Sequence, residues 1–312
     1  MSLVVPVYFE EECIERFLEE TRPVLDALPL DWEIVFIDDG SADRTVELLL
    51  AAAALDPRLK LVELSYNHGK QGALTAGIAH ASGDLLLMMD PDLQDPPEEI
   101  PRLLDALGDR YDLVFGVRSE KRDSLKNRAL SAVFWRVLEG FTGLSIPRGV
   151  AVMRVFNRAF ADRFLRYREQ NRFIEGMFMH VGMRRGTLEI AQRPRFAGRS
   201  KFNFARKLEL ALTAIFDFSD LPLRLTMRLG LSMVAVGVLA FVAIVIARVL
   251  VSTMQMGWAS VMAAMCTGFG AQIFLMGVVG QYVGRLYRES KGRPLFSVRA
   301  RTNLARRAGD DG

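Results

Sequence analysis

The chain has 312 residues, half of them hydrophobic and a quarter charged, with a formal net charge of +3 at neutral pH. This length allows two domains or one large domain. The two cysteines, Cys13 and Cys266, form neither a metal-ligand spacing nor a disulfide framework, which indicates a reducing compartment. Acidic residues begin at Glu10, which is too early for a secretory signal peptide.

Short β-rich runs alternate with helical patterns through the first 120 residues. The predicted strands are residues 3–7, 32–37, 59–64, 84–89 and 111–117. The predicted helices are residues 11–27, a segment opening at Asp43, residues 69–81 and a segment opening at Pro97. This alternation predicts an α/β fold whose mostly parallel sheet is covered by helices on both faces.

Polar residues follow four of these strands at the point where each ends. The four segments are Tyr8–Glu10, Asp38–Ser41, Asn67–Lys70 and Asp90–Asp95. One acidic turn is unremarkable, because Asp and Pro favour turns for local reasons. Ligands of such sheets bind beyond the carboxyl ends of the strands. Four polar ends at one edge therefore predict a site for an anion held through a cation. No dinucleotide or phosphate-loop glycine motif is present.

Several motifs together resemble one family. They are "PVYFEEE", "DDGSADRT", "NHGKQGALTAGIAHASGD", "MMDPDLQDPPEEIP", "NRFIEGMFMHVG" and "RFAGRSKFNF". In this order, and followed by long apolar segments, they resemble the inverting, metal-dependent glycosyltransferases of the A-type fold. The nearest resemblance is to polyprenyl-phosphate glycosyltransferases, such as dolichyl-phosphate mannose synthases and bacterial lipid-carrier enzymes, and it runs from about residue 3 to residue 298.

The resemblance implies a nucleotide-sugar site at the acidic strand ends. Its nucleotide-sugar contacts would be Pro6, Tyr8, Glu10, Asp38, Asp39, Lys70 and Asp90. Its metal ligands would be Asp90, Asp92 and Gln94, holding Mg²⁺ or Mn²⁺ as a Lewis acid on the leaving diphosphate. Lys70 can balance diphosphate charge, or it can be an ordinary solvated lysine at a helix start. Asp95 is expected to be a local cap rather than a ligand.

The acceptor of that family is the phosphate of an isoprenoid lipid. A phosphate monoester has a second pKa near ~6, so it is mostly dianionic and needs positioning rather than deprotonation. With Asp92, the resemblance assigns catalysis to Arg118, Arg128 and Ser131, which would contact the acceptor phosphate together with Arg199, Ser200 and Lys201. Exposed basic helix faces and positive-inside topology are the alternative explanations for these cations.

Two positions depart from the family pattern. Phe9 stands where an Asn is frequent, which puts one contact near the nucleotide in doubt. Val152 stands where many members have an Asp, in the segment "AVMRVFNR". Because the acceptor is already ionised, we expect the missing carboxylate to alter acceptor positioning or specificity rather than to abolish activity.

Two charge-poor stretches near the C-terminus predict membrane spans. Leu229–Ala247 has 19 uncharged residues, which as a helix cover ~29 Å, about one hydrocarbon thickness. Gly257–Val283 is long enough to span again, although a pair of buried helices in a soluble core would look similar. Arginines and lysines flank the pair on one side, so both ends are expected in the cytoplasm. Gly280 and Gly284, four residues apart, are a weak sign of close helix packing and a homo-oligomer, although glycine is common in membrane helices in any case.

These features predict four regions and one activity. The regions are a cytoplasmic transferase domain (1–200), an amphipathic interfacial segment (201–225), a transmembrane hairpin (226–284) and a cytoplasmic basic tail (285–312). The expected activity, at the inner (plasma) membrane, is sugar transfer from a UDP-linked donor to undecaprenyl phosphate. A processive polysaccharide synthase and a catalytically silent membrane scaffold are the alternatives. Nucleic acid is not an expected partner, because the basic stretch 184–207 is juxtamembrane and has no stacking aromatics beyond Phe196, Phe202 and Phe204.

Overall fold

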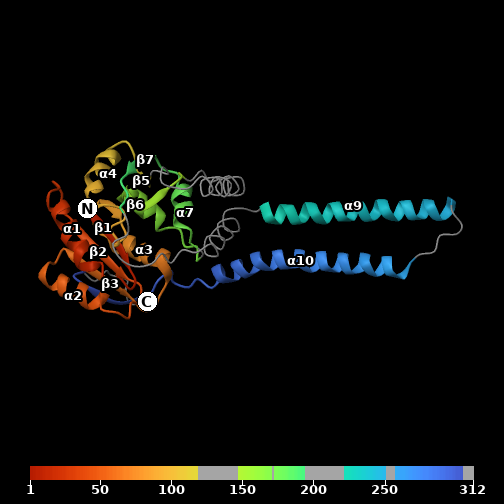
Figure 1. Cartoon of the computed structure of the whole chain (residues 1–312), viewed down its shortest axis with the longest axis horizontal. Helices are drawn as coiled ribbons and strands as arrows, with labels where there is room; N and C mark the ends of the chain where they lie inside the picture. Colours follow the sequence, from red (N-terminus) through yellow and green to blue (C-terminus); the bar gives the residue numbers. More distant parts are fainter. Residues whose placement is uncertain (119–146, 171, 194–220, 251–256, 305–312) are drawn as a thin grey trace. The chain divides into compact units, whose positions relative to one another are not determined.

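The computed structural model describes residues 1–118, 147–170, 172–193, 221–250 and 257–304. The chain divides into two compact units (Figure 1). The first contains the β-sheet and takes in the C-terminal residues from Pro294 onward. The second contains two long helices and ends at Arg293.

Among the described residues the sheet has eight strands, in the order β7-β5-β6-β4-β1-β2-β3-β8. They are β1 (Ser2–Val7), β2 (Glu33–Asp38), β3 (Leu59–Leu64), β4 (Leu85–Met88), β5 (Leu113–Arg118), β6 (Val150–Asn157), β7 (Arg185–Ile190) and β8 (Val298–Thr302). The neighbours β4, β1, β2 and β3 are parallel, as predicted. The whole sheet is mixed, because β6 runs antiparallel to β4 and β5, and β8 runs antiparallel to β3.

Helices cover both faces of this sheet. They are α1 (Ile14–Asp26), α2 (Thr45–Leu55), α3 (Gly69–His80), the short η1 (Pro97–Glu99), α4 (Ile100–Leu107), α6 (Arg158–Phe164) and α7 (Ile174–His180). The main hydrophobic core joins α1, α2 and α4 to alternate strand residues such as Leu3 and Val5. The intervening residues face α3: a Cβ at Gly77 of α3 would lie 2.3 Å from Cγ1 of Val4, so only glycine allows this close approach.

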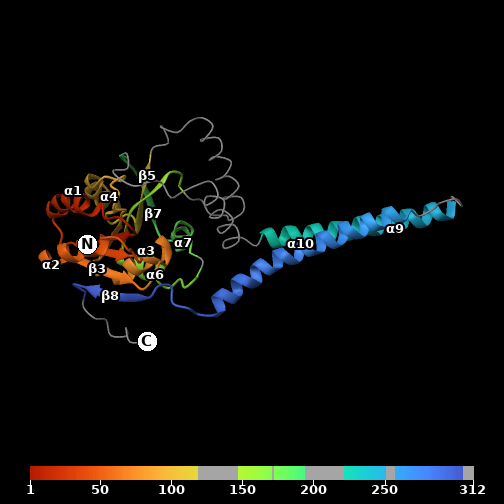
Figure 2. The same ribbon diagram turned by 60° about the horizontal axis from the view of Figure 1, so that its bottom comes forward.

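The second unit is a pair of long helices, α9 (Leu221–Leu250) and α10 (Trp258–Ser290), which lie side by side (Figures 1 and 2). Among the described residues, only α9 contains a window, Leu223–Ala240, that is long and apolar enough to cross a membrane. The prediction of two spanning helices is therefore not confirmed.

Candidate active site

The carboxyl ends of β4, β1, β2 and β3 lie at one edge of the sheet. Their registers bring these ends level, because Val7 pairs with Asp38 and Asp38 pairs with Glu63. The chain leaves β4 beside β1, where the backbone N–H of Met89 donates to the carbonyl of Val4 at 3.1 Å. All four polar segments identified in the sequence therefore begin at the same edge.

The aspartates after β2 form a tight turn. The Asp38 carboxylate accepts hydrogen bonds from the backbone N–H groups of Gly40 and Ser41, at 3.2 and 3.1 Å. Asp39 is 3% exposed, and its Oδ1 accepts the backbone N–H of His68 at 2.6 Å. Burial raises the pKa of Asp39, and the hydrogen bonds from the loop backbone offset only part of that effect.

The segment after β4 exposes its polar residues by an unusual backbone geometry. Leu93 has a φ of +55°, a left-handed conformation that bulky residues rarely adopt, and its side chain is buried in the main core. Asp92 and Gln94 on either side of it are half-buried, and the Gln94 N–H donates to Oδ1 of Asp92 at 3.2 Å. Lys70 approaches from the start of α3, with Nζ 2.6 Å from Oδ2 of Asp90.

The thiol of Cys13 is affected by acidic residues that follow β1 and β4. The pKa of Cys13, just before α1, is raised to about 12, first by burial and then by the negative charges of Glu10 and Asp92, among others. The negative charges of Glu10 and Asp92 thus both oppose ionisation of this thiol. Acidic residues from two strand ends share this edge, where the Lys70 ammonium is the cation facing Asp90.

The donor atoms at this edge suit a hard divalent cation. Among the described residues, no three His, Cys, Asp or Glu side chains cluster as a ready-made metal site. The predicted set is instead two carboxylates and one amide, Asp90, Asp92 and Gln94. Mg²⁺ is commonly bound through one or two carboxylates, with water and substrate phosphates as its other ligands. The residues thus fit an ion that a nucleotide diphosphate helps to hold.

Asp95 forms a long-range ion pair, so the expectation of a local cap is wrong. It is 3% exposed, and its Oδ1 lies 2.8 Å from Nε and 2.6 Å from Nη2 of Arg118, the last residue of β5. Its Oδ2 accepts the backbone N–H of Met153 in β6 at 3.4 Å. Burial raises the pKa of Asp95 although the Arg118 guanidinium opposes the shift. This pair connects the segment after β4 to the antiparallel side of the sheet.

The remaining predicted positions divide between the edge and segments that are not described. Pro6 is buried in β1, and Tyr8 is half-buried at its end. Phe9 is exposed with a φ of +56°, a left-handed conformation that an Asn would tolerate better than a bulky residue. Val152 is half-buried in β6. Five predicted acceptor contacts lie outside the described residues: Arg128, Ser131, Arg199, Ser200 and Lys201.

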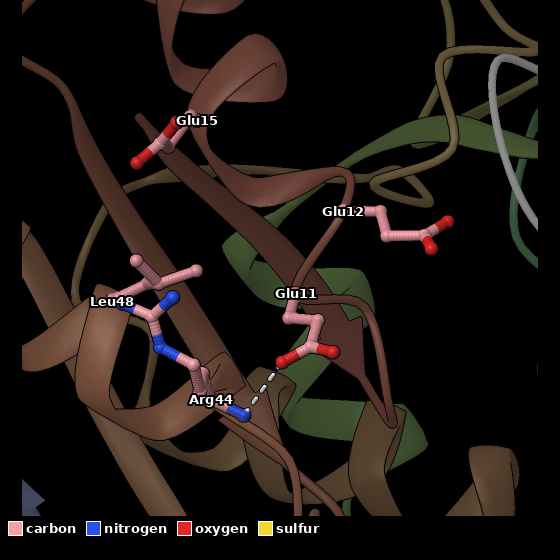
Figure 3. A pocket seen from close by; sticks show the side chains of 5 residues that line it. All are labelled: Glu11, Glu12, Glu15, Arg44 and Leu48. Atoms are coloured by element: carbon pink, nitrogen blue, oxygen red, sulfur yellow. Dashed lines mark hydrogen bonds between the residues drawn. The ribbon is translucent and has the colours of Figure 1, made fainter.

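A separate acidic depression of about 300 Å³ lies beside the start of α1 (Figure 3). Its lining residues are Glu11, Glu12, Glu15, Arg44 and Leu48. The Glu11 carboxylate accepts the backbone N–H of Arg44 at 3.0 Å, while Glu12 and Glu15 point away from that contact. Three carboxylates and one guanidinium line this depression, and their net negative charge would repel a diphosphate, so it is not the predicted nucleotide site.

The mixed sheet with helices on both faces is the A-type fold of nucleotide-sugar transferases. Residues 2–165 match the model of glycosyl transferase family 2, and the chain belongs to this family. It is therefore a glycosyltransferase, as the motifs predicted.

The similarity to known proteins extends over nearly the whole chain. An undecaprenyl-phosphate 4-deoxy-4-formamido-L-arabinose transferase of Salmonella choleraesuis is 34% identical over 96% of this chain and 92% of its own. The uncharacterized glycosyltransferase sll0501 of Synechocystis is 35% identical over 96% and 94%. A solved mannosyltransferase of Pyrobaculum calidifontis, in complex with GDP-Man and Mn²⁺, is 18% identical over 90% and 86%, with a TM-score of 0.47.

Proposed function

We propose that this chain transfers a sugar from a nucleoside diphosphate sugar, UDP-linked, to the phosphate of a polyprenyl lipid such as undecaprenyl phosphate. The observation that carries the proposal is the acidic strand-end edge of a family 2 chain, with Asp90, Asp92 and Gln94 following one buried strand. The acceptor class is supported by the Salmonella relative, which matches this chain over most of both lengths.

The reaction makes one bond and breaks one. The bond between the sugar C1 and the β-phosphate oxygen of the donor breaks, and a bond between C1 and an oxygen of the lipid phosphate forms with inversion. The nucleoside diphosphate leaves with the electron pair. A bound Mg²⁺ or Mn²⁺ would supply Lewis-acid neutralisation of this leaving group, held by Asp90, Asp92 and Gln94.

The chain's own residues bind and orient the two substrates. The buried Asp38 and Asp39 would hold the base and ribose, and Lys70 would exchange its Asp90 partner for the diphosphate. Arg118 would meet the acceptor phosphate while Asp95 fixes its guanidinium. Arg128, Ser131, Arg199, Ser200 and Lys201 complete the proposed acceptor contacts.

Val152 fits a reaction that needs no general base. The acceptor phosphate is mostly dianionic near neutral pH, so positioning replaces deprotonation. We expect Val152→Asp to change acceptor preference without a large rise in turnover. A gain of more than about 100-fold would show that a base is missing and would contradict this view.

We further propose a location at the inner (plasma) membrane, with the transferase domain (1–200) and both chain ends cytoplasmic. α9 supports this location, because it is long and apolar enough to span. The proposed interfacial segment (201–225), hairpin (226–284) and basic tail (285–312) follow from the charge pattern, and a homo-oligomer remains part of the proposal.

The decisive experiment offers the full chain, in lipid nanodiscs with undecaprenyl phosphate, a panel of UDP- and GDP-sugars with Mg²⁺ or Mn²⁺. We expect one UDP-sugar to be consumed, only when both lipid phosphate and metal are present. Asp92→Asn is the matched control and should be inactive. Consumption of no nucleotide sugar under any metal would contradict the proposal.

A further inference from the structure

The C-terminal residues 294–303, here called the strap, lie along the edge of the sheet next to the candidate site. They contain β8, which pairs with β3 from Leu61↔Thr302 to Leu64↔Val298. At the far end of the strap, Nδ2 of Asn303 donates to the carbonyls of Ala53 and Leu59, at 2.8 and 2.9 Å. The strap thus belongs to the sheet unit, although it follows α10 in the chain.

One strap residue holds the loop that follows β3. The carbonyl of Ser297 accepts both the backbone N–H and the Oγ–H of Ser65, each at 2.9 Å. The N–H of the same Ser297 donates to Nε2 of His68 at 3.2 Å. The loop is therefore attached to the strap at its first residue and again three residues later.

His68 is built to accept this hydrogen bond. Its ring lies against Tyr66, with the two centroids 3.9 Å apart, and it is half-buried. Burial lowers the pKa of His68, which favours the neutral imidazole. The hydrogen bond from the Ser297 N–H requires the lone pair on Nε2, which leaves the hydrogen on Nδ1. The ring therefore packs against Tyr66 and is also held by the hydrogen bond from Ser297 of the strap.

The backbone of the same residue reaches the candidate nucleotide site. The N–H of His68 donates to Oδ1 of Asp39 at 2.6 Å. Gly40, with a φ of +81°, packs on the loop so closely that a Cβ would lie 3.2 Å from the backbone N of Asn67. A continuous path of hydrogen bonds therefore runs from Ser297 through His68 to Asp39.

We propose that His68 is a positioning residue through which the strap fixes the loop 65–70 and Asp39, so that nucleotide binding requires a docked strap. The proposal rests on the proposed function for the role of Asp39. His68 acts through Asp39 and does not itself contact the sugar or the reacting phosphate. Because the strap begins four residues after α10 ends, the same path connects the nucleotide subsite to the helical hairpin along the chain.

Two substitutions at His68 separate the acceptor atom from the bulk of the ring. The Oε1 of a glutamine can replace Nε2 as acceptor, so we expect His68→Gln to bind UDP with Mn²⁺ within about twofold of the parent. His68→Leu keeps bulk but accepts nothing, and we expect its UDP dissociation constant to rise about 5- to 10-fold. The KM for the nucleotide sugar should rise with it, while the KM for polyprenyl phosphate stays unchanged.

Ser297→Pro removes the donor N–H and keeps the carbonyl that Ser65 uses. In a double-mutant cycle, His68→Leu and Ser297→Pro should not be additive, because each breaks the same hydrogen bond. Calorimetry on the full chain in detergent measures UDP binding, and the melting temperature of each variant shows that it is folded. Parent-like binding by His68→Leu, equal losses in His68→Gln and His68→Leu, or full additivity would each overturn the proposal.

Amide hydrogen exchange in the loop 65–70 tests this inference independently of the proposed function, because it needs no nucleotide. Without nucleotide, the loop 65–70 should exchange faster in His68→Leu than in the parent or in His68→Gln. If the parent binds no UDP, the proposed function fails, and exchange alone decides whether the strap orders the loop. Equal exchange in all three proteins would overturn the coupling.

Discussion

Two buried carboxylates at opposite ends of β2 have pKa values shifted in opposite directions. Glu33, the first residue of the strand, is 7% exposed and accepts hydrogen bonds from Lys60, Ser2 and Ser82. Burial alone would raise its pKa, but these bonds outweigh burial and lower it to about 2. Asp39, beyond the last residue of the strand, is equally buried, yet its pKa is raised.

The difference distinguishes the amino end of the strand, here called the stabilising edge, from the carboxyl end with its aspartates, here called the binding edge. At the amino end, hydroxyl, ammonium and backbone donors surround the Glu33 carboxylate, so its charge is compensated within the chain. At the carboxyl end, Asp38, Asp39, Asp90 and Asp92 share backbone N–H groups and one lysine. A carboxylate whose pKa is raised by burial, as that of Asp39 is, is typical of functional sites.

Removal of an acid from the binding edge should have the largest effect on activity. We expect Asp92→Ala to lower kcat/KM by about 100- to 1000-fold, because charge on the leaving diphosphate is no longer neutralised. Its melting temperature should stay close to that of the parent, since the side chain is only half-buried and lies in a loop outside the hydrophobic core. Sugar-transfer rates at several Mn²⁺ concentrations measure the effect. A variant that behaves like the parent would revive the silent-scaffold alternative.

Removal of the acid from the stabilising edge should affect unfolding instead. Glu33→Gln should lower the free energy of unfolding by roughly 2–3 kcal/mol at pH 7, as its pKa shift implies, with UDP affinity unchanged. The folded-state pKa is below the unfolded value, so this contribution is complete above about pH 4.5 and is lost as the pH falls towards 2.

Urea unfolding of the parent and of Glu33→Gln, at pH 7 and at pH 3.5, tests this effect. The stability gap between the two proteins should narrow at the lower pH. An unchanged gap would show that the carboxylate charge does not stabilise the fold.

Patterns local in sequence predicted the parallel half of the fold and its acidic edge. β1 to β4 are short apolar runs with polar ends, and each pattern is visible within about ten residues. β6, β7 and β8 were not predicted. β8 reads "VRART", whose alternation of small or apolar residues with arginine signals an edge strand, but its partner β3 is more than 200 residues away in the chain.

The site contacts missed in the sequence are also long-range. The side chain of Asp95 pairs with Arg118 and the backbone of Met153, residues 23 and 58 positions away. His68 meets Ser297, 229 positions away. Local turn chemistry explains the residue types at each strand end, but it cannot show which side chains the folded sheet brings together.

The Asp95–Arg118 pair tests whether the antiparallel side of the edge serves the acceptor. Asp95→Asn keeps an acceptor for the Met153 N–H but removes the charge that orients Arg118. We expect the KM for polyprenyl phosphate to rise about tenfold, with UDP affinity unchanged. In steady-state kinetics, Arg118→Gln should likewise raise the KM for polyprenyl phosphate and leave UDP affinity unchanged. An equal loss of UDP binding would place the pair in the nucleotide subsite instead.

The smallest effect is expected in the acidic depression of Figure 3. Glu15 lines it but lies within α1, beyond the strand ends. Glu15→Gln should leave both the UDP dissociation constant and the transfer rate within about twofold of the parent. A loss comparable to that of Asp92→Ala would mean that the nucleotide binds among these glutamates rather than at the strand ends.

The central claim is that the acidic edge transfers a sugar from a diphosphate leaving group to a lipid phosphate. Phosphorus NMR of the lipid product made by the parent, together with identification of the released nucleotide, tests this most directly. The account predicts a sugar joined to the lipid through one phosphate, with release of a nucleoside diphosphate. A sugar joined through a pyrophosphate, with release of a nucleoside monophosphate, would contradict it.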